Sequence, residues 1–234
     1  MVPTMEFSDP RDRFIHRVAK NKSFVDVGGL WGTKGERVSV AHAAGARELT
    51  MIDGCTAGDE WWQKFEARRQ DLGVPPVRSI SGEIVQLSQS DASLKFEVVH
   101  CSGVLYHAAE PLRLLRALRT VTTGHLILSS CITDTVIENE AGTLRVPDGG
   151  ALFVPALTAQ ERAIVYNRWS PAVGRNAIGL TNDDTDWNPD DTGPWWWLPT
   201  TKALAAMCRV AGFVVEDVAE YWDGHAASVL ARVN

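Results

Sequence analysis

Residues 24–32 read Phe-Val-Asp-Val-Gly-Gly-Leu-Trp-Gly, and this stretch decides the fold class. A short apolar run leads into an acidic residue and then into a glycine-rich turn. Glycine allows a tight turn and lets the backbone come close to a ligand. Asp53 ends the next apolar run, 27 residues after Asp26, which is the spacing of one strand–helix–strand unit. An acid there can bind the hydroxyl pair of a ribose. Together these features predict a nucleoside-type cofactor at the carboxyl ends of a parallel sheet.

Working outward, apolar runs alternate with helical patterns over the first 131 residues. Strands are expected over 23–27, 48–52, 77–81, 95–101 and 125–131, and helices from Pro10 and over 34–44, 57–72 and 110–121. Gly45 closes one helix, and Gly124 is expected to end the last of them before its strand begins. This alternation is typical of an α/β protein with a parallel sheet.

The pattern breaks between residues 133 and 197, which are rich in Asn, Asp, Pro, Gly and Trp. It returns with a helix that Thr200 caps and Gly212 ends, followed by strands over 213–218 and 226–233. We therefore expect a single domain over 1–234, with residues 133–197 as a cap or lid inserted before the last helix.

Bulk composition narrows the function classes. The chain has 234 residues and a net charge of −6, and it shows no basic patch of the kind that nucleic-acid binding needs. Its four cysteines are scattered, which predicts reduced core residues and a cytoplasmic location. No run reaches the roughly 18 apolar residues of a membrane span, and no export signal is seen. The oligomeric state stays open, with a homodimer as one option.

Two further segments lie at expected strand ends. Gly82-Glu83 follows the third strand, where an acid can accept hydrogen bonds from an adenine amino group, although a solvated turn would look the same. The fourth strand leads directly into Ser102-Gly103 and then Tyr106-His107. Ligands bind at this edge of such sheets, and histidine suits general-base work near neutral pH. A structural histidine held in a turn is the alternative for His107.

This set of segments resembles the class I, Rossmann-like S-adenosylmethionine-dependent methyltransferases. Asp26-Val27-Gly28 with Gly32 matches the first motif of that class, with Leu30 in place of its middle glycine. The resemblance implies an α/β fold with a seven-stranded, mainly parallel sheet whose last strand inserts antiparallel. It also implies S-adenosylmethionine as the cofactor. The cofactor-binding residues predicted on this basis are Asp26, Gly28, Gly29, Trp31, Asp53, Gly82, Glu83 and Ser102. Trp31 lies either beside the methionine part of the cofactor or packed under the turn.

A narrower similarity links residues 103–107 and 197–200 to the carboxymethyltransferases that form uridine-5-oxyacetic acid in tRNA. In that family the tyrosine matching Tyr106 contacts an extra carboxylate of the cofactor, and the residue matching Ser102 is also at the cofactor. The family's C-terminal arginine has no counterpart in 224–227, and its long N-terminal extension is missing here. We therefore expect ordinary S-adenosylmethionine and no tRNA substrate.

The predicted reaction is methyl transfer to an oxygen or nitrogen of a small molecule. A sulfonium is a strong leaving group, so the enzyme mainly supplies proximity and alignment. His107 is the candidate base where the acceptor must lose a proton, and Tyr106 would orient the acceptor or the cofactor. The alternatives are a tRNA-modifying enzyme and a non-catalytic module, the latter suggested by Leu30. A dehydrogenase is disfavoured, since the turn lacks the full G-x-G-x-x-G spacing.

The inserted segment carries an acidic run over 182–191 and then Pro194-Trp195-Trp196-Trp197. One interpretation is a lid whose aromatic side chains exclude water from the substrate. The other is a solvent-exposed acidic loop, with the tryptophans packed at the sheet edge. The aspartates lack the regular alternation of a calcium loop, so no metal site is predicted.

Overall fold

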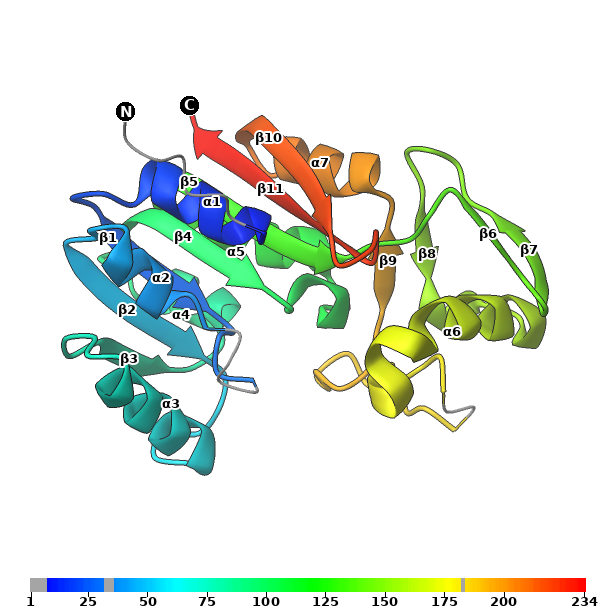
Figure 1. Cartoon of the computed structure of the whole chain (residues 1–234), viewed down its shortest axis with the longest axis horizontal. Coiled ribbons are helices and arrows are strands. Elements are labelled where there is room, and N and C mark those ends of the chain that lie inside the picture. Colours follow the sequence, from blue (N-terminus) through cyan, green and yellow to red (C-terminus); the bar gives the residue numbers. More distant parts are fainter. Residues whose placement is uncertain (1–7, 32–35, 182–183) are drawn as a thin grey trace.

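The protein is built on one seven-stranded sheet, described here from a computed structural model (Figure 1) that covers residues 8–31, 36–181 and 184–234. Its strands are β1 (Ser23–Val27), β2 (Glu48–Asp53), β3 (Arg78–Ser81), β4 (Phe96–Ser102), β5 (Thr122–Cys131), β10 (Phe213–Tyr221) and β11 (Ala226–Val233). The spatial order is β10-β11-β5-β4-β1-β2-β3. Strand β11 runs antiparallel to both of its neighbours, β5 and β10, and the other described strand pairs of this sheet are parallel. The predicted mainly parallel sheet with an antiparallel last strand is confirmed.

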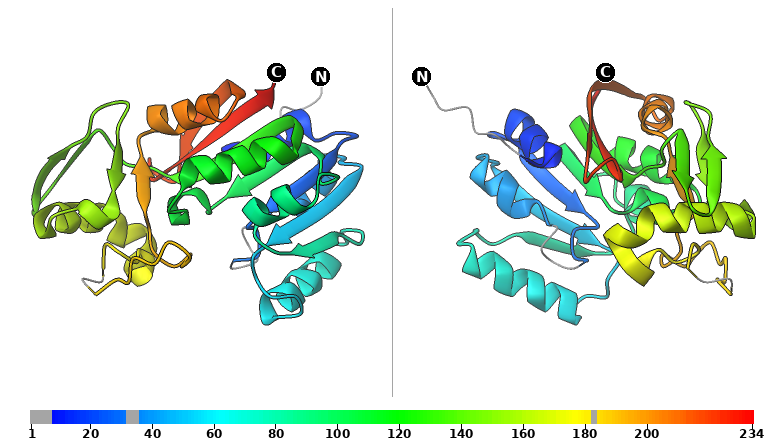
Figure 2. Two further views of the ribbon diagram at one scale, coloured as in Figure 1. Left: turned by 180° about the vertical axis from the view of Figure 1, so that it is seen from behind. Right: turned by 45° about the vertical axis from the view of Figure 1, so that its right-hand side comes forward.

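Helices cover both faces of the sheet (Figure 2). The helices are α1 (Pro10–Val18), α2 (Val38–Ala43), α3 (Glu60–Asp71), α4 (Ile84–Ser90), α5 (Pro111–Val121) and α7 (Thr201–Val210). One apolar core collects side chains from α1, α2 and α3, and a second collects them from α4, α5 and α7. Strands β1 and β4 lie in the middle of the sheet and are almost wholly buried, as a doubly covered parallel strand requires.

Local chemistry starts the helices where the sequence predicts. Asp9 caps α1 by accepting the backbone N–H of Arg11 at 2.9 Å, and Pro10 occupies the first turn. Thr200 caps α7 in the same way through the N–H of Ala203 at 3.2 Å. Gly212 then ends that helix with a φ of +94°.

Three details differ from the sequence prediction. Helix α2 begins at Val38 rather than Lys34, and Lys34 itself lies outside the described residues. Gly124 does not end a helix but lies inside β5. Glycine is needed at this position because a Cβ there would overlap the backbone oxygen of Glu97. The β4–β5 register shifts at this close approach. Helix α4 was not predicted, because its seven residues bury only Ile84 and leave little periodic signal.

The inserted segment folds around its own apolar core, on the right of Figure 1. It comprises β6 (Val136–Asn139), β7 (Gly142–Arg145), β8 (Ala151–Phe153) and α6 (Ala159–Val173), and returns to the main sheet through β9 (Trp197–Pro199). Strands β8 and β9 pair antiparallel and close the segment at its base. None of the helices in the described parts of the chain is long and apolar enough to cross a membrane.

Candidate functional site

The glycine turn after β1 has a backbone that favours glycine. Gly28 has a φ of +78° and its N–H donates to Ile52 O at 2.9 Å. A Cβ on Gly28 would overlap Val104, and a Cβ on Gly29 would lie 2.5 Å from Asp26 Oδ2. Leu30, in place of the usual middle glycine, is fully buried in the core beneath α1 and α2. Its side chain therefore leaves the outer side of the turn clear.

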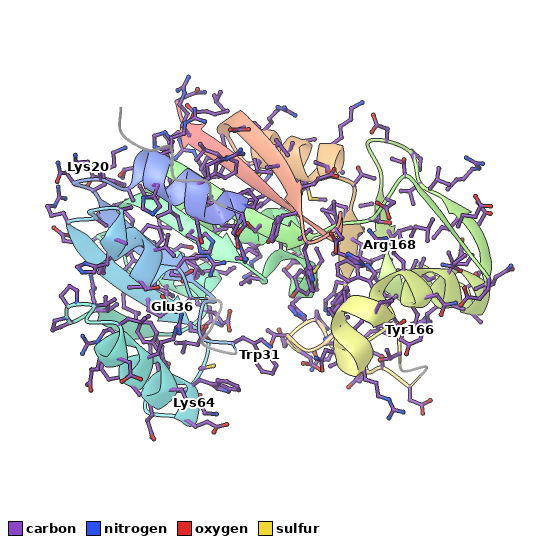
Figure 3. The ribbon with its side chains drawn as sticks, in the orientation of Figure 1. Lys20, Trp31, Glu36, Lys64, Tyr166 and Arg168 are labelled. Carbon is purple, nitrogen blue, oxygen red and sulfur yellow. The ribbon has the colours of Figure 1, made fainter. Side chains whose placement is uncertain are left out.

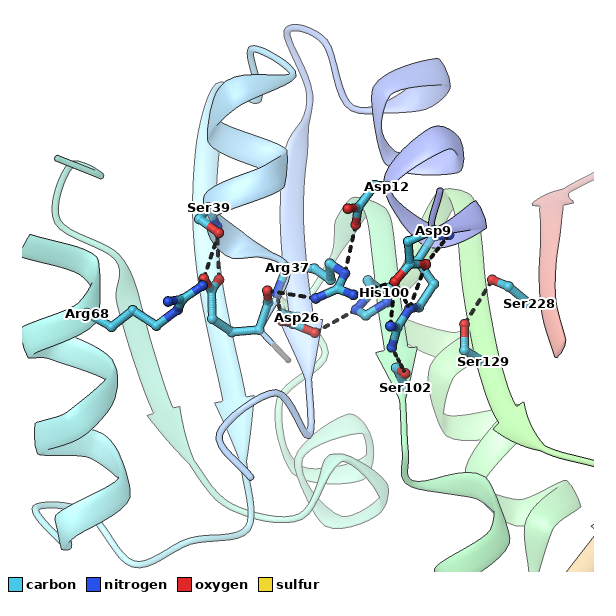
Figure 4. A network of polar contacts seen from close by, with 12 residues as sticks. Asp9, Asp12, Asp26, Arg37, Ser39, Arg68, His100, Ser102, Ser129 and Ser228 are labelled. Carbon is cyan, nitrogen blue, oxygen red and sulfur yellow. Dashed lines mark hydrogen bonds and ion pairs between the residues drawn. The ribbon is translucent and has the colours of Figure 1, made fainter. Parts of the chain in front are cut away.

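Asp26 holds the far end of the same loop from inside the protein. Its Oδ2 accepts the backbone N–H of Arg37 at 2.6 Å, and its Oδ1 lies 2.7 Å from Nδ1 of His100 (Figure 4). Asp26 and His100 are both buried, and they are directly paired in the β1–β4 register. Both carboxylate oxygens of this predicted cofactor residue thus have partners within the chain. Gly32, predicted to belong to the turn, lies outside the described residues.

The carboxyl ends of β2 and β3 bring three predicted residues together. Asp53 accepts the N–H of Leu30 at 3.1 Å on Oδ2 and the N–H of Cys55 at 3.0 Å on Oδ1. A carboxylate offers about four lone-pair sites, so each oxygen can still accept a ligand hydroxyl. Gly82 donates its N–H to Asp53 O at 2.8 Å. The Glu83 carboxylate lies against Gly54, and partial burial and the Asp53 charge raise the pKa of Glu83.

Trp31 stands out as a large apolar side chain left in water. It is 80% exposed, and its ring lies 5.3 Å from that of Trp61. Figure 3 shows Trp31 on the side of the main sheet that faces the inserted segment. The expectation that Trp31 packs under the turn is therefore wrong, and the ring is free to contact a ligand.

The end of β4 forms the other side of the site. Ser102 Oγ accepts a hydrogen bond from Arg11 Nη1 at 3.0 Å. Gly103 is exposed with a φ of +77°, and a Cβ there would meet only the Tyr106 hydroxyl, at 3.9 Å. Burial, together with a hydrogen bond to Cys131, keeps the pKa of Tyr106 well above its usual value, so its hydroxyl stays protonated. The space above Gly103 is open beside a neutral hydroxyl group.

His107 sits in a short 3-10 turn, η1 (Leu105–His107), and faces the inserted segment. Its Nδ1 lies 3.1 Å from Pro194 O, and a carbonyl only accepts, so Nδ1 carries the proton. Nε2 of the neutral ring is then the basic nitrogen. Burial lowers the pKa of His107, against the carbonyls of Pro194 and Gly193 and the charge of Asp191, which raise it. The ring is thus neutral at pH 7 and able to accept a proton.

The tryptophan-rich segment packs directly against this turn. Trp195 stacks edge-on with Tyr106 at 4.9 Å and with Trp169 at 4.8 Å, and Trp196 N donates to Tyr106 O at 2.7 Å. Trp195 and Trp196 are buried. Asn182 and Asp183 of the acidic run lie outside the described residues. Within the part of the chain that the structure describes, no three His, Cys, Asp or Glu side chains gather as a metal site would require.

Arg11 and Tyr221 are site residues that the sequence did not suggest. Arg11 comes from α1 and stacks over the Tyr221 ring at 4.9 Å, next to its hydrogen bond with Ser102. Neither residue belongs to a recognisable motif. Their only advance signal was that Arg11 follows the helix cap Asp9 by two residues.

Comparison with known proteins gives one distant relative in sequence. No protein-family model matches the chain. Its sequence is 26% identical over 195 residues to the tRNA U34 carboxymethyltransferase of Psychrobacter sp. (strain PRwf-1), covering 70% of this chain and 51% of that protein. The chain thus spans about half the length of this curated relative.

Solved structures extend the comparison over almost the whole chain. The 1,6-didemethyltoxoflavin-N1-methyltransferase of Burkholderia thailandensis, with its substrate and S-adenosylhomocysteine bound, gives a TM-score of 0.57 at 14% identity, covering 97% of this chain and 78% of that one. The magnesium protoporphyrin IX methyltransferase of Synechocystis PCC 6803, with S-adenosylhomocysteine bound, gives 0.58 at 13% identity, covering 96% and 82%. An S-adenosylmethionine-dependent methyltransferase of Aquifex aeolicus gives 0.53 at 13% identity, covering 97% and 95%. The chain has the class I S-adenosylmethionine-dependent methyltransferase fold.

Proposed function

We propose that this protein transfers the methyl group of S-adenosylmethionine to an oxygen or nitrogen of a small molecule. The observation that carries the proposal is the group of Asp53, Gly82 and Glu83 beside the bare turn at Gly28 and Gly29. A carboxylate with unused lone pairs suits a ribose, and a second carboxylate one strand away suits an amino group of adenine. These hydrogen-bond acceptors fit an adenosine cofactor at the place where such sheets bind ligands.

Individual residues then take distinct roles. Gly28 and Gly29 offer backbone without side chains beside the amino-acid part of the cofactor. Asp53 binds the ribose hydroxyls, and Glu83 the adenine. Trp31 covers the bound cofactor from the solvent side. Asp26 acts indirectly, since its oxygens hold the loop that carries the turn.

His107 and Tyr106 would handle the acceptor. The cofactor supplies an electrophilic methyl group, so the protein's main task is to hold the acceptor atom in line with it. Nε2 of His107 takes the proton of an acceptor that must lose one. The Tyr106 hydroxyl donates its proton to Cys131, so at the open space above Gly103 its oxygen accepts a hydrogen bond that orients the acceptor.

A second candidate, modification of tRNA, is favoured by the 26% identity to a tRNA U34 carboxymethyltransferase. The net charge of −6 disfavours it, because tRNA binding draws on a surplus of Lys and Arg. Binding of tRNA that weakens steeply with added salt would favour this candidate over a small-molecule acceptor.

Calorimetry with S-adenosylhomocysteine tests the cofactor assignment. Wild-type protein should bind it, and Asp53→Asn should bind at least about tenfold more weakly, the size of a lost hydrogen bond to a charged group. Asp71→Asn removes a charge from an exposed residue at the end of α3 and serves as the matched control. No binding to wild-type protein at millimolar ligand would refute the proposal. His107→Gln should reduce turnover of an acceptor while leaving S-adenosylhomocysteine binding unchanged.

A further inference from the structure

Helix α1 delivers one arginine to the carboxyl edge of the sheet. Arg11 reaches across 91 residues of sequence to donate from Nη1 to Ser102 Oγ at 3.0 Å. Its guanidinium carbon lies 4.9 Å from the ring centre of Tyr221, at the end of β10. The Arg11 side chain is mostly buried, and 18% of its surface reaches solvent.

The hydrogen bonds of Arg11 leave part of its guanidinium group unused. Nε donates to Asp9 at 3.0 Å and Nη2 donates to Asp9 at 2.6 Å. With the bond from Nη1 to Ser102, these contacts use three nitrogens once each. A guanidinium group has five N–H donors. Two N–H groups, one on Nη1 and one on Nη2, thus have no described partner. Ser102, which Nη1 contacts, is followed in the chain by the exposed Gly103.

The negative charge beside Arg11 is shared with a second arginine. Arg37 Nη2 lies 2.7 Å from the same Asp9 oxygen, and Arg37 Nε lies 2.8 Å from Asp12 (Figure 4). Asp9 thus contacts two guanidinium groups, and Asp12 supplies a second carboxylate, so the charges of this cluster balance. These contacts fix Arg11 in place, and what it offers a ligand is its two remaining N–H groups rather than an excess of charge.

We propose that Arg11 is an oxyanion-binding residue that receives a ligand carboxylate at the end of β4. Arginine suits this task because two N–H groups can bind a carboxylate together. The proposal rests on the proposed function. Under that function two carboxylates could be the group that Arg11 binds: the one on the amino-acid part of the cofactor, or an acid group on the acceptor. The chemistry at Arg11 is the same for both.

The test compares Arg11→Gln with Arg13→Gln. Arg13 lies on the same helix, and its side chain is 51% exposed, with a 3.9 Å ion pair to Asp217 and a contact over the Phe14 ring, so its variant loses the same charge elsewhere. Calorimetry measures S-adenosylhomocysteine and 5′-methylthioadenosine, which keeps the nucleoside and sulfur but lacks the amino acid. Ligand-observed NMR then measures benzoate and its neutral analogue benzamide on protein saturated with S-adenosylhomocysteine.

Each outcome decides the matter. If Arg11→Gln weakens S-adenosylhomocysteine at least about tenfold and leaves 5′-methylthioadenosine unchanged, Arg11 binds the cofactor carboxylate. If it leaves both unchanged but abolishes a preference for benzoate over benzamide, Arg11 binds an acid group of the acceptor. Behaviour equal to Arg13→Gln in every measurement would overturn the proposal.

Two further measurements distinguish failure of this proposal from failure of the proposed function and from misfolding of the variant. If wild-type protein binds neither nucleoside, the proposed function fails, and benzoate binding to the free protein then decides the role of Arg11 alone. If Arg11→Gln does not fold, Arg11→Lys replaces it, since lysine keeps the charge but loses the paired N–H geometry. We then expect a weaker affinity for the carboxylate ligand, because lysine cannot bind it through two paired N–H groups, and no change for its neutral counterpart.

Discussion

Replacing Asp9 by Asn isolates the charge that joins α1 to the loop before α2. Asn keeps a side-chain oxygen for the cap and ranks with Asp as a capping residue, so helix α1 should still start at Pro10. What disappears is the charge opposite Arg11 and Arg37. Burial opposes ionisation of Asp9, but the hydrogen bonds and charges of the two arginines outweigh it and lower the pKa of Asp9 from 3.8 to about 2.

The expected loss follows from that shift. One pKa unit corresponds to about 1.36 kcal/mol, so a fall from 3.8 to about 2 corresponds to about 2.4 kcal/mol. Because the Asp9 side chain is 21% exposed and water screens the pairs, we reduce this to roughly 1–2 kcal/mol for Asp9→Asn at pH 7.

The pH dependence gives the sharper test. The folded pKa of Asp9 lies below the unfolded value, so its contribution is complete well above pH 4 and is lost as the pH falls toward 2. The difference between wild type and Asp9→Asn in the free energy of unfolding, measured in urea, should fall to about half at pH 3. Asp217→Asn, which affects only surface pairs with Arg13 and Arg17, should cost less than about 0.5 kcal/mol. An equal difference at pH 3 and pH 7, or none at pH 7, would refute the reasoning.

Two other predictions follow from the site. Gly28→Ala should lower the free energy of unfolding in urea by roughly 2–4 kcal/mol, because it combines a left-handed backbone with overlap of Val104; a variant as stable as wild type would contradict the described turn. In an NMR titration His107 should show a pKa below 6.5, and Asp191→Asn should lower that pKa further by removing a charge that favours the imidazolium; an unchanged or raised value would mean that Asp191 does not act on the ring.

The sequence predicted the main sheet well because its strands are self-contained signals. Strands β1 and β11 occupy the predicted residues, since each is an apolar run bounded by turn residues. The inserted segment had no such signal. Strands β8 and β9 have three residues each and pair Ala151 with Pro199 across the whole insertion. Pairing of this kind is set by tertiary contacts and leaves no periodic pattern in the sequence.

The candidate site likewise contains residues that the sequence could predict and residues that it could not. Asp53, Gly82 and Glu83 could be predicted to meet, because each lies at the carboxyl end of a parallel strand. Arg11 could not, since its place depends on how α1 crosses the sheet and how far a long side chain reaches. For Asp26 the sequence located the residue but not its partners. His100 and the backbone of Arg37 reach its oxygens only through the β1–β4 register and the path of the following loop.

The place of β11 in the sheet has a consequence for synthesis of the chain. Strand β11 lies between β5 and β10, yet it follows every other strand of the sheet in sequence. While the ribosome is still making residues 226–233, the edge of β5 has no partner and β10 has nowhere to attach. An uncovered apolar strand edge invites pairing with other chains. The nascent protein is therefore most prone to aggregation at this sheet just before β11 emerges, and a chaperone that shields β5 would act in that interval.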